Sequence, residues 1–260
     1  SQMYDLPVNS LYCYLQIRSA LRAFGMPWGD VLEPHPLVKL CSSGSAKGLV
    51  SKLYLFCIKA AEKPLLLTSR WERDLSTPSA DINWRSVWAN ISLASRNPNH
   101  QMIHFNFVHR TYCTPSKRFR MFLAPSPICD LCPLGVSGSF FHMVWECPAV
   151  KLFWGDVANK LSAVLGFRIP VSPIILLLND LSGLDLSVAR RRWLLAGLTA
   201  AKKMIAQRWM APHLLPIRQW RLATVNIAKL EMSIARMQGA REANISSWLS
   251  FISALQNLIL

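Results

Sequence analysis

Three cysteines and a histidine lie close together near the middle of the chain, at a spacing that suits a metal ion. Two residues separate Cys129 from Cys132, nine more precede His142, and a further four precede Cys147. Zinc in structural sites takes four tetrahedral ligands, and two cysteines with two residues between them can bind it from one tight turn. Four protein ligands leave no open position for water. The spacing therefore predicts a structural zinc ion without a catalytic role.

Other interpretations of these residue types have less support in the sequence. The four side chains could be unrelated buried groups. A C-x-x-C pair is also typical of redox proteins, but a thioredoxin-like context is missing. His100 and His104 lie four residues apart on one face of a predicted helix, yet neither an H-E-x-x-H pattern nor a third ligand accompanies them. We expect both, and His109 beyond them, to face solvent, a phosphate or packed neighbours.

Charge separates the metal-ligating stretch from its surroundings. Residues 1–124 carry a net charge of +8 and residues 151–260 one of +9, whereas residues 125–150 hold two acidic groups and no basic one. Prolines cluster where this stretch begins, at Pro115, Pro125, Pro127 and Pro133. Because proline interrupts regular structure, an irregular unit is expected here.

Three parts are therefore predicted: a basic helical region at 1–124, a CCHC zinc-binding module at 125–154, and a basic helical region at 155–260. A short metal module needs some apolar packing around its ion. Four aromatic side chains would supply it, namely Phe140, Phe141, Trp145 and Trp154.

Helical periodicity of apolar residues dominates both flanks of the module. It predicts helices at residues 82–93, 99–112, 187–209, 220–237 and 245–255, with Gly239 as a natural stop for the fourth. Sustained alternation of the kind that marks strands is missing. The expected fold is mainly α, with helical segments flanking a small irregular CCHC module.

The overall charge indicates a polyanionic partner. Lys and Arg number 29 against 14 Asp and Glu, a net charge of +15, while 52% of residues are hydrophobic, which is enough for a core. Nucleic acid or an acidic membrane surface would fit. The longest apolar runs are too short to cross a bilayer, so a membrane-spanning protein is not expected. Seven cysteines without a secretory signal favour a reducing intracellular compartment, nuclear or cytoplasmic.

Two groups of basic residues are the candidates for phosphate contacts. The first lies just before the module, interleaved with Tyr112, Phe119 and Phe122, whose rings could stack on unpaired bases; it comprises Arg110, Lys117, Arg118 and Arg120. The second is expected on the polar side of the 187–209 helix and comprises Arg191, Arg192, Lys202 and Lys203. An ordinary solvated connector is the alternative interpretation of the first group.

Several stretches resemble the C-terminal region of reverse transcriptases from LINE-type (non-LTR) retrotransposons of vertebrates, the fish and amphibian branches above all. The resemblance covers nearly the whole chain, and the cysteine–histidine cluster running into His142-Met143-Val144-Trp145-Glu146-Cys147-Pro148 is its specific part. The supporting stretches are Tyr14 to Arg18, Arg70 to Leu75, His109 to Pro115, Phe153-Trp154 and Leu194 to Lys203. The loop between Cys132 and His142 is longer than is usual for the family.

This resemblance implies thumb-side helices and a zinc module that follow a polymerase domain and help to hold template RNA or target DNA. The chain begins at Ser1, and we expect it to be part of a longer protein. No two acidic residues are adjacent, so the paired aspartates that hold catalytic metals in polymerases are missing, and no catalytic residue is assigned. The alternatives are a protein-interaction scaffold derived from a retroelement remnant and, with least support, an independent metalloenzyme.

Overall fold

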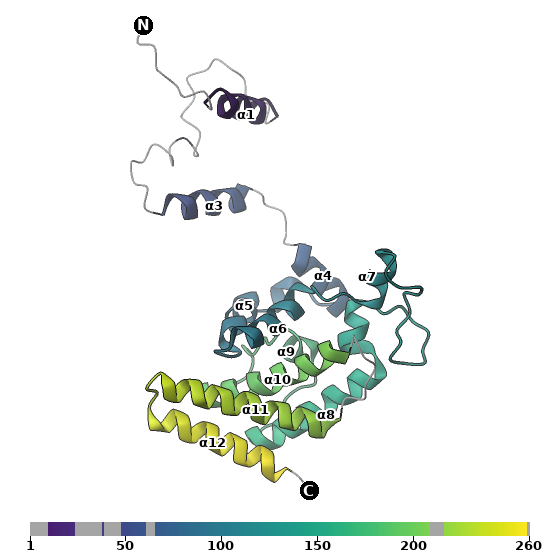
Figure 1. Cartoon of the computed structure of the whole chain (residues 1–260), viewed down its shortest axis with the longest axis vertical. Helices are drawn as coiled ribbons and strands as arrows, with labels where there is room; N and C mark the ends of the chain where they lie inside the picture. Colours follow the sequence, from purple (N-terminus) through teal and green to yellow (C-terminus); the bar gives the residue numbers. More distant parts are fainter. Residues whose placement is uncertain (1–9, 24–37, 39–47, 61–65, 209–215, 259–260) are drawn as a thin grey trace. The chain divides into compact units, whose positions relative to one another are not determined.

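Helices make up nearly all the regular structure of the chain, as Figure 1 shows. The computed structural model describes residues 10–23, 38, 48–60, 66–208 and 216–258. Within these residues there is no β-strand, only an isolated antiparallel bridge between Ile128 and Ser137. The prediction of a mainly α fold is confirmed. No helix in the described ranges combines the length and apolar character that a membrane crossing needs.

The chain divides into two compact units, residues 1–63 and 64–260. The first contains α1 (Ser10–Ala23) and α3 (Leu49–Ala60). The second spans both boundaries expected from charge, at 124 and 154. Its elements are α4 (Leu66–Leu75), the 3-10 turn η1 (Ser79–Asp81), α5 (Trp84–Leu93), α6 (Pro98–His109), α7 (Pro115–Arg120), the π-helical turn η2 (His142–Glu146), α8 (Pro148–Leu165), α9 (Pro173–Leu176), α10 (Val188–Arg208), α11 (Ile217–Met237) and α12 (Glu242–Asn257).

Local sequence explains where several of these helices begin. The side chain of Asn97 accepts a hydrogen bond from the Asn99 amide before α6, and Thr114 accepts one from the Lys117 amide before α7. In both helices proline takes the first position, where its missing N–H costs nothing. The ends also fit the predictions closely, although residue 209 of the predicted 187–209 helix lies outside the described residues.

Helix α10 forms the centre of the second unit and packs against α6, α8, α11 and α12 (Figure 1). Nine consecutive residues, 194–202, are buried. Helices α8 and α10 cross closely at Gly197, where an added Cβ would lie 2.6 Å from the Leu161 side chain. The Gly197 carbonyl accepts a hydrogen bond of 2.9 Å from the Trp220 indole. Because helices surround α10, this stretch has no solvent-facing side.

This burial corrects one predicted phosphate contact. Lys202 has no exposed surface. Its Nζ donates to Asn179 Oδ1 at 2.7 Å and lies 2.9 Å from His104 Nδ1. The Asn179 backbone carbonyl in turn accepts a 2.7 Å hydrogen bond from the side-chain Nδ2 of Asn90 in α5. Lys202 thus ties α10 to α6 and to the segment after α9, and it is unavailable to a nucleic acid on the surface.

Burial lowers the pKa of Lys202 well below its usual value. It also lowers the pKa of His104, with a smaller contribution from the neighbouring Lys202. Between the depressed folded-state pKa of Lys202 and its unfolded value of about 10.4, the folded protein binds fewer protons than the unfolded chain. The free energy of unfolding therefore rises with pH in this window. Below it, protonation of the buried amine opposes folding.

The Lys202→Met variant tests this linkage. Over the pH units just below about 10.4, we expect the free energy of unfolding to rise with pH more steeply in the unaltered chain than in the variant, by up to about 1.4 kcal/mol per pH unit. Urea unfolding across this range measures the difference. Lys203→Met, a change at the exposed neighbour on the same helix, is the control and should keep the dependence of the unaltered chain. Equal pH slopes in all three proteins would show that Lys202 is not buried as a neutral amine.

Candidate metal centre

Cys129 and Cys132 lie in a hairpin-like loop that backbone hydrogen bonds hold together. The Cys129 amide donates to the Val136 carbonyl at 2.9 Å, and the Gly138 amide donates to the Pro127 carbonyl at 2.8 Å. Gly135 makes the return turn with φ +62°, a left-handed conformation that glycine adopts without strain. We call residues 127–138 the metal loop. Its closure turns both cysteine side chains toward the same side.

His142 and Cys147 come from the next segment, where a single π-helical turn sets their separation. The Cys147 amide donates to the His142 carbonyl at 2.9 Å, across five residues. The His142 amide donates to Ser139 Oγ at 3.1 Å. Cys147 is the N-cap residue of the 18-residue helix α8.

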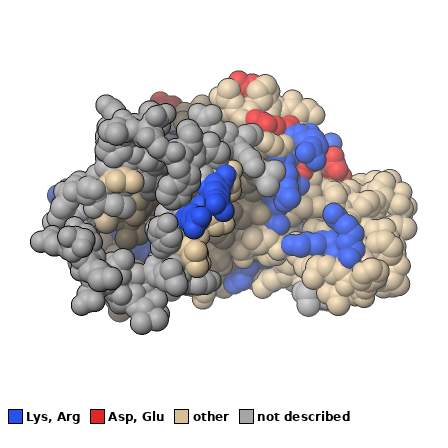
Figure 2. Space-filling model, turned by 90° about the horizontal axis from the view of Figure 1, so that it is seen from above, with Lys and Arg blue, Asp and Glu red and all other residues tan. Residues whose placement is uncertain are grey.

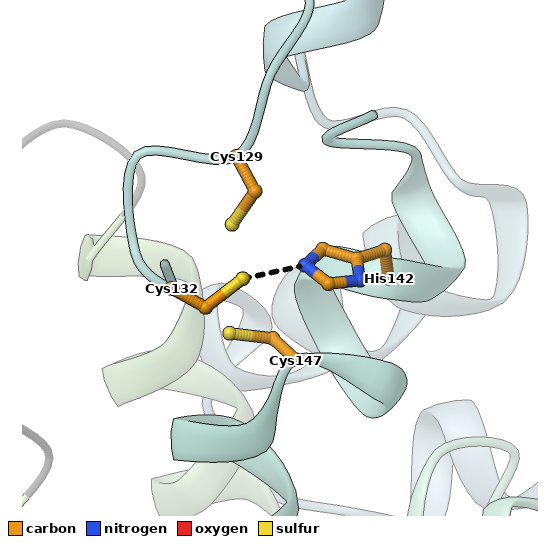
Figure 3. Close-up of side chains that lie close together, drawn as sticks. All are labelled: Cys129, Cys132, His142 and Cys147. Carbon is orange, nitrogen blue, oxygen red and sulfur yellow. Dashed lines mark hydrogen bonds between the residues drawn. The ribbon is translucent and has the colours of Figure 1, made fainter. Parts of the chain in front are cut away.

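The four side chains converge, as Figure 3 shows. Their ligand atoms all lie within 4.8 Å of one another, and Cys132 Sγ lies 3.5 Å from His142 Nε2. Ligands around a tetrahedral zinc ion are separated by about 3.3 to 3.8 Å, given bond lengths of about 2.0 to 2.3 Å. Small movements of the sulfur atoms would complete the coordination. The predicted cluster is therefore able to hold a metal ion.

The electrostatics of the cluster fit a cation. Burial, followed by the neighbouring Cys147 and Cys132 thiols, raises the pKa of Cys129 to about 12, although a 3.4 Å hydrogen bond from the Leu131 amide favours the thiolate. A divalent ion reverses this balance because it binds the deprotonated sulfurs directly. Burial also lowers the pKa of His142, against the opposing effect of Glu146. A neutral imidazole is the form that ligates metals.

The aromatic residues predicted to surround the ion do lie in the core, but they do not form a separate small core. Phe140 and Phe141 make edge-to-face contacts with the fully buried Trp71 of α4, at centroid distances of 6.0 and 6.5 Å. Trp154 donates to the Val144 carbonyl at 2.9 Å, and Trp145 is half-buried. The metal cluster therefore sits at the edge of the main hydrophobic core of the second unit.

Arg110, a predicted phosphate contact, is instead engaged inside the protein. It adopts the left-handed conformation that ends α6 and pairs with Asp74 of α4. Its guanidinium also lies 5.0 Å from the ring centroids of both Trp71 and Phe140. Burial lowers its pKa, and the Asp74 carboxylate opposes that shift. The residues that engage it, Asp74 and Trp71, lie nearly 40 positions earlier, so local sequence gives no signal of the contact.

Helix α7 carries the rest of the first basic group on its surface. Lys117, Arg118 and Arg120 are exposed, and none forms an ion pair within the described residues. The Ser116 amide donates to the Gly138 carbonyl at 3.3 Å, and Ser116 Oγ lies 2.7 Å from Ser137 Oγ. In Figure 2, lysine and arginine side chains lie at several places on the face shown, and acidic side chains border the group at the upper right.

The second basic group does not form one exposed face. Lys203 is exposed, whereas Arg191 and Arg192 are half-buried and Lys202 is fully buried. Arg192 donates to Asn244 Oδ1 of α12 at 3.1 Å. The predicted patch on α10 is therefore smaller than periodicity suggested.

The histidines of α6 lie among packed neighbours, one of the outcomes expected for them. His104 is bound to Lys202, and His100 Nδ1 lies 3.1 Å from Ser95 Oγ, which itself donates to Glu231. The His109 ring stacks on Phe105 with centroids 4.0 Å apart.

No protein-family model matches the chain. Two features of its structure bear on its function. One is the four-ligand cluster, and the other is the basic surface of α7 that lies against the metal loop.

Proposed function

We propose that the cluster binds one zinc ion and that its role is structural. Three thiolates and one imidazole form a donor set that suits zinc, and oxygen-preferring ions such as magnesium are disfavoured by sulfur ligands. All four ligands come from the protein, which leaves no position for a reacting water. The ion would join the metal loop to the start of α8, two segments linked only by the stretch around Ser139.

Metal analysis of the purified chain tests this assignment. We expect about one zinc per chain in the unaltered protein. The Cys132→Ser and His142→Ala variants should lose most of it, because removal of one of the four ligands greatly lowers the affinity of a tetrahedral site. Cys113→Ser is the matched control, since Cys113 is an exposed cysteine outside the cluster. Elemental analysis by mass spectrometry gives the stoichiometry. Equal zinc in the ligand variants and the control would exclude the site.

We further propose that α7 and the turn after it bind single-stranded nucleic acid. The exposed Lys117, Arg118 and Arg120 would neutralise phosphates, and no acidic residue occurs between Pro115 and Ile128 to oppose them. Phe119 is also exposed on this helix. Aromatic rings beside cations are the usual platform for unpaired bases.

Phe122 is the single observation that best supports a partner here. Its side chain is 97% exposed, and its backbone has φ +57°. Burying a phenylalanine stabilises a protein by about 1.5 to 3 kcal/mol, and bulky residues adopt positive φ only at a cost. The protein therefore holds an aromatic ring in solvent in a strained conformation, an arrangement that clusters at ligand contacts. A base stacked on the ring would supply the missing burial.

The metal loop would set the position of this surface. Pro115 and Ser116, at the start of α7, lie against Gly138 so closely that an added Cβ there would be 2.8 Å from the Pro115 ring. If zinc holds the loop in shape, it also holds the base of α7. Following the resemblance to LINE-type reverse transcriptases, we propose that this surface holds template RNA or target DNA for a polymerase domain outside these 260 residues.

Removal of the three charges of α7 should weaken binding and its dependence on salt. For Lys117→Gln/Arg118→Gln/Arg120→Gln we expect the slope of log affinity against log salt to fall by about 2, since each phosphate contact on a single strand contributes about 0.7. Fluorescence anisotropy with labelled oligo-dT and oligo-U at several salt concentrations measures the slope. The control, Lys151→Gln/Lys229→Gln/Arg236→Gln, removes three exposed charges elsewhere. An equal loss in both variants would indicate diffuse attraction and no site on α7.

Phe122→Ala should weaken binding in a different manner. Loss of one base-stacking contact costs about 1 to 3 kcal/mol, so affinity should fall by about tenfold. The salt slope should stay unchanged because the charges remain. Leu123→Ala, at the exposed neighbouring residue, is the control for a general loss of apolar surface. The same anisotropy titration reports both values, and an unaltered affinity in Phe122→Ala would contradict the stacking role.

Docking of a protein partner is the second candidate, favoured by the apolar residues that the metal loop exposes. Ile128, Leu134 and Val136 all lie on the surface beside α7. A protein-interaction module derived from a retroelement remnant would use this surface without nucleic acid. Absence of nucleic-acid binding, together with a stable complex of this chain with a protein, would favour this function.

A further inference from the structure

A second basic feature lies apart from α7, where the end of α12 meets α8 and the start of α11. These three helices lie side by side in Figure 1 and contact one another. They border a cavity of about 440 Å³ that is partly open to solvent, within the size range of small-ligand sites. Its described lining consists of Lys160, Ile217, Arg218, Trp220, Arg221 and Leu258. Three of these six residues are cationic and none is acidic.

The cations that line this cavity have hydrogen-bonding capacity that described residues of the protein do not satisfy. Neither Arg218 nor Arg221 forms an ion pair or a side-chain hydrogen bond with another described residue. Lys160 donates to the Leu258 carbonyl at 3.4 Å, which leaves two further N–H groups on its ammonium. Three positive charges around one cavity repel one another. An anion among them would relieve that repulsion and accept charge-assisted hydrogen bonds.

The backbone adds to the positive potential. Arg218 and Arg221 lie in the first turns of α11, a helix of 21 residues whose N-terminus has no side-chain cap and no acidic residue. The first N–H groups of a helix point out of its end and favour a negative group there. Guanidinium groups bind phosphate oxygens in pairs. The cavity thus suits a phosphate better than a singly charged anion.

The rest of the lining is apolar. Trp220 is buried, with its N–H already donated to the Gly197 carbonyl, so its ring presents only carbon to neighbouring groups. Ile217 and Leu258 are half-buried. Inorganic phosphate would leave these surfaces uncovered. A ligand with a phosphate group and an apolar body would contact both the cationic and the apolar residues of the cavity.

We propose that this cavity binds an organic phosphate, a phosphate ester whose charged group contacts Lys160, Arg218 and Arg221 and whose apolar body covers Ile217 and Leu258. Nucleotides and alkyl phosphates share this chemistry. The inference does not rest on the function proposed for α7, because it uses different residues and a different ligand size.

Calorimetric titration of the full zinc-loaded chain tests the proposal, with thymidine 5′-monophosphate, hexyl phosphate and inorganic phosphate as probes at low salt. At least one ester should bind more tightly than inorganic phosphate, and the tighter ester identifies the source of the ligand. Arg218→Gln/Arg221→Gln should weaken that binding by about tenfold or more, since charge-assisted hydrogen bonds are lost. Chemical-shift changes at the Ile217 amide should locate the ligand.

The control is Arg236→Gln/Arg241→Gln. It removes two exposed charges, one at the opposite end of α11, about 27 Å along the helix from Arg218, and one at the N-cap of α12. Arg218→Gln alone, at an exposed residue, gives a second variant with little risk to folding. Esters that bind no better than inorganic phosphate, or equal losses in the two double variants, would overturn the proposal. The triple variant of α7 should keep the ester binding, so failure at one site is distinguishable from failure at the other.

Discussion

The convergence of three thiols and one imidazole is the constraint on which the surface around α7 depends. The metal loop forms few hydrogen bonds of its own, and most of its apolar side chains face solvent. A loop of this kind has little burial to offset the entropy of ordering it. A structural zinc ion contributes about 10 to 16 kcal/mol of apparent binding free energy in small metal modules, which would be ample to order it. The metal loop, against which the start of α7 packs, would then depend on the ion for its shape.

The module and the helical core are not independent, in spite of the change in composition between them. Phe140 and Phe141 pack against Trp71 of α4, and Cys147 begins α8, whose buried face forms part of the central core. An isolated metal module must build its own apolar core. Here the residues that could have formed one are shared with the rest of the unit. We therefore expect that loss of the ion would disorder the metal loop without unfolding the helices around α10.

Sequence alone predicted the ligand set and most helices because both depend on short-range spacing. The four candidate ligands from Cys129 to Cys147 span 19 residues, and the apolar residues of α11 recur at helical spacing. The burial of Lys202 and the pairing of Arg110 could not be predicted in this way. Periodicity assigns an inner and an outer face to a helix that has one packed side, and α10 is surrounded. Asp74, the partner of Arg110, comes close to it only when α4 and α6 pack together in the folded protein.

Buried and exposed cations in this chain therefore have different meanings, although composition counts them equally. Arg110 is held by an acidic partner inside the unit. Lys202 is held by polar partners, and its burial favours the neutral amine, so both residues contribute to the fold and not to the surface. The cations of α7 and of the cavity beside α11 form no ion pair among the described residues. Of these, Arg120 and Lys160 each donate a side-chain hydrogen bond to a backbone carbonyl. Unpaired like charges close together raise the energy of the folded protein, and anions bound at these two places, as proposed above, would lower it. Net charge predicts a polyanionic partner, and burial separates the cations engaged inside the unit from those that such a partner could reach.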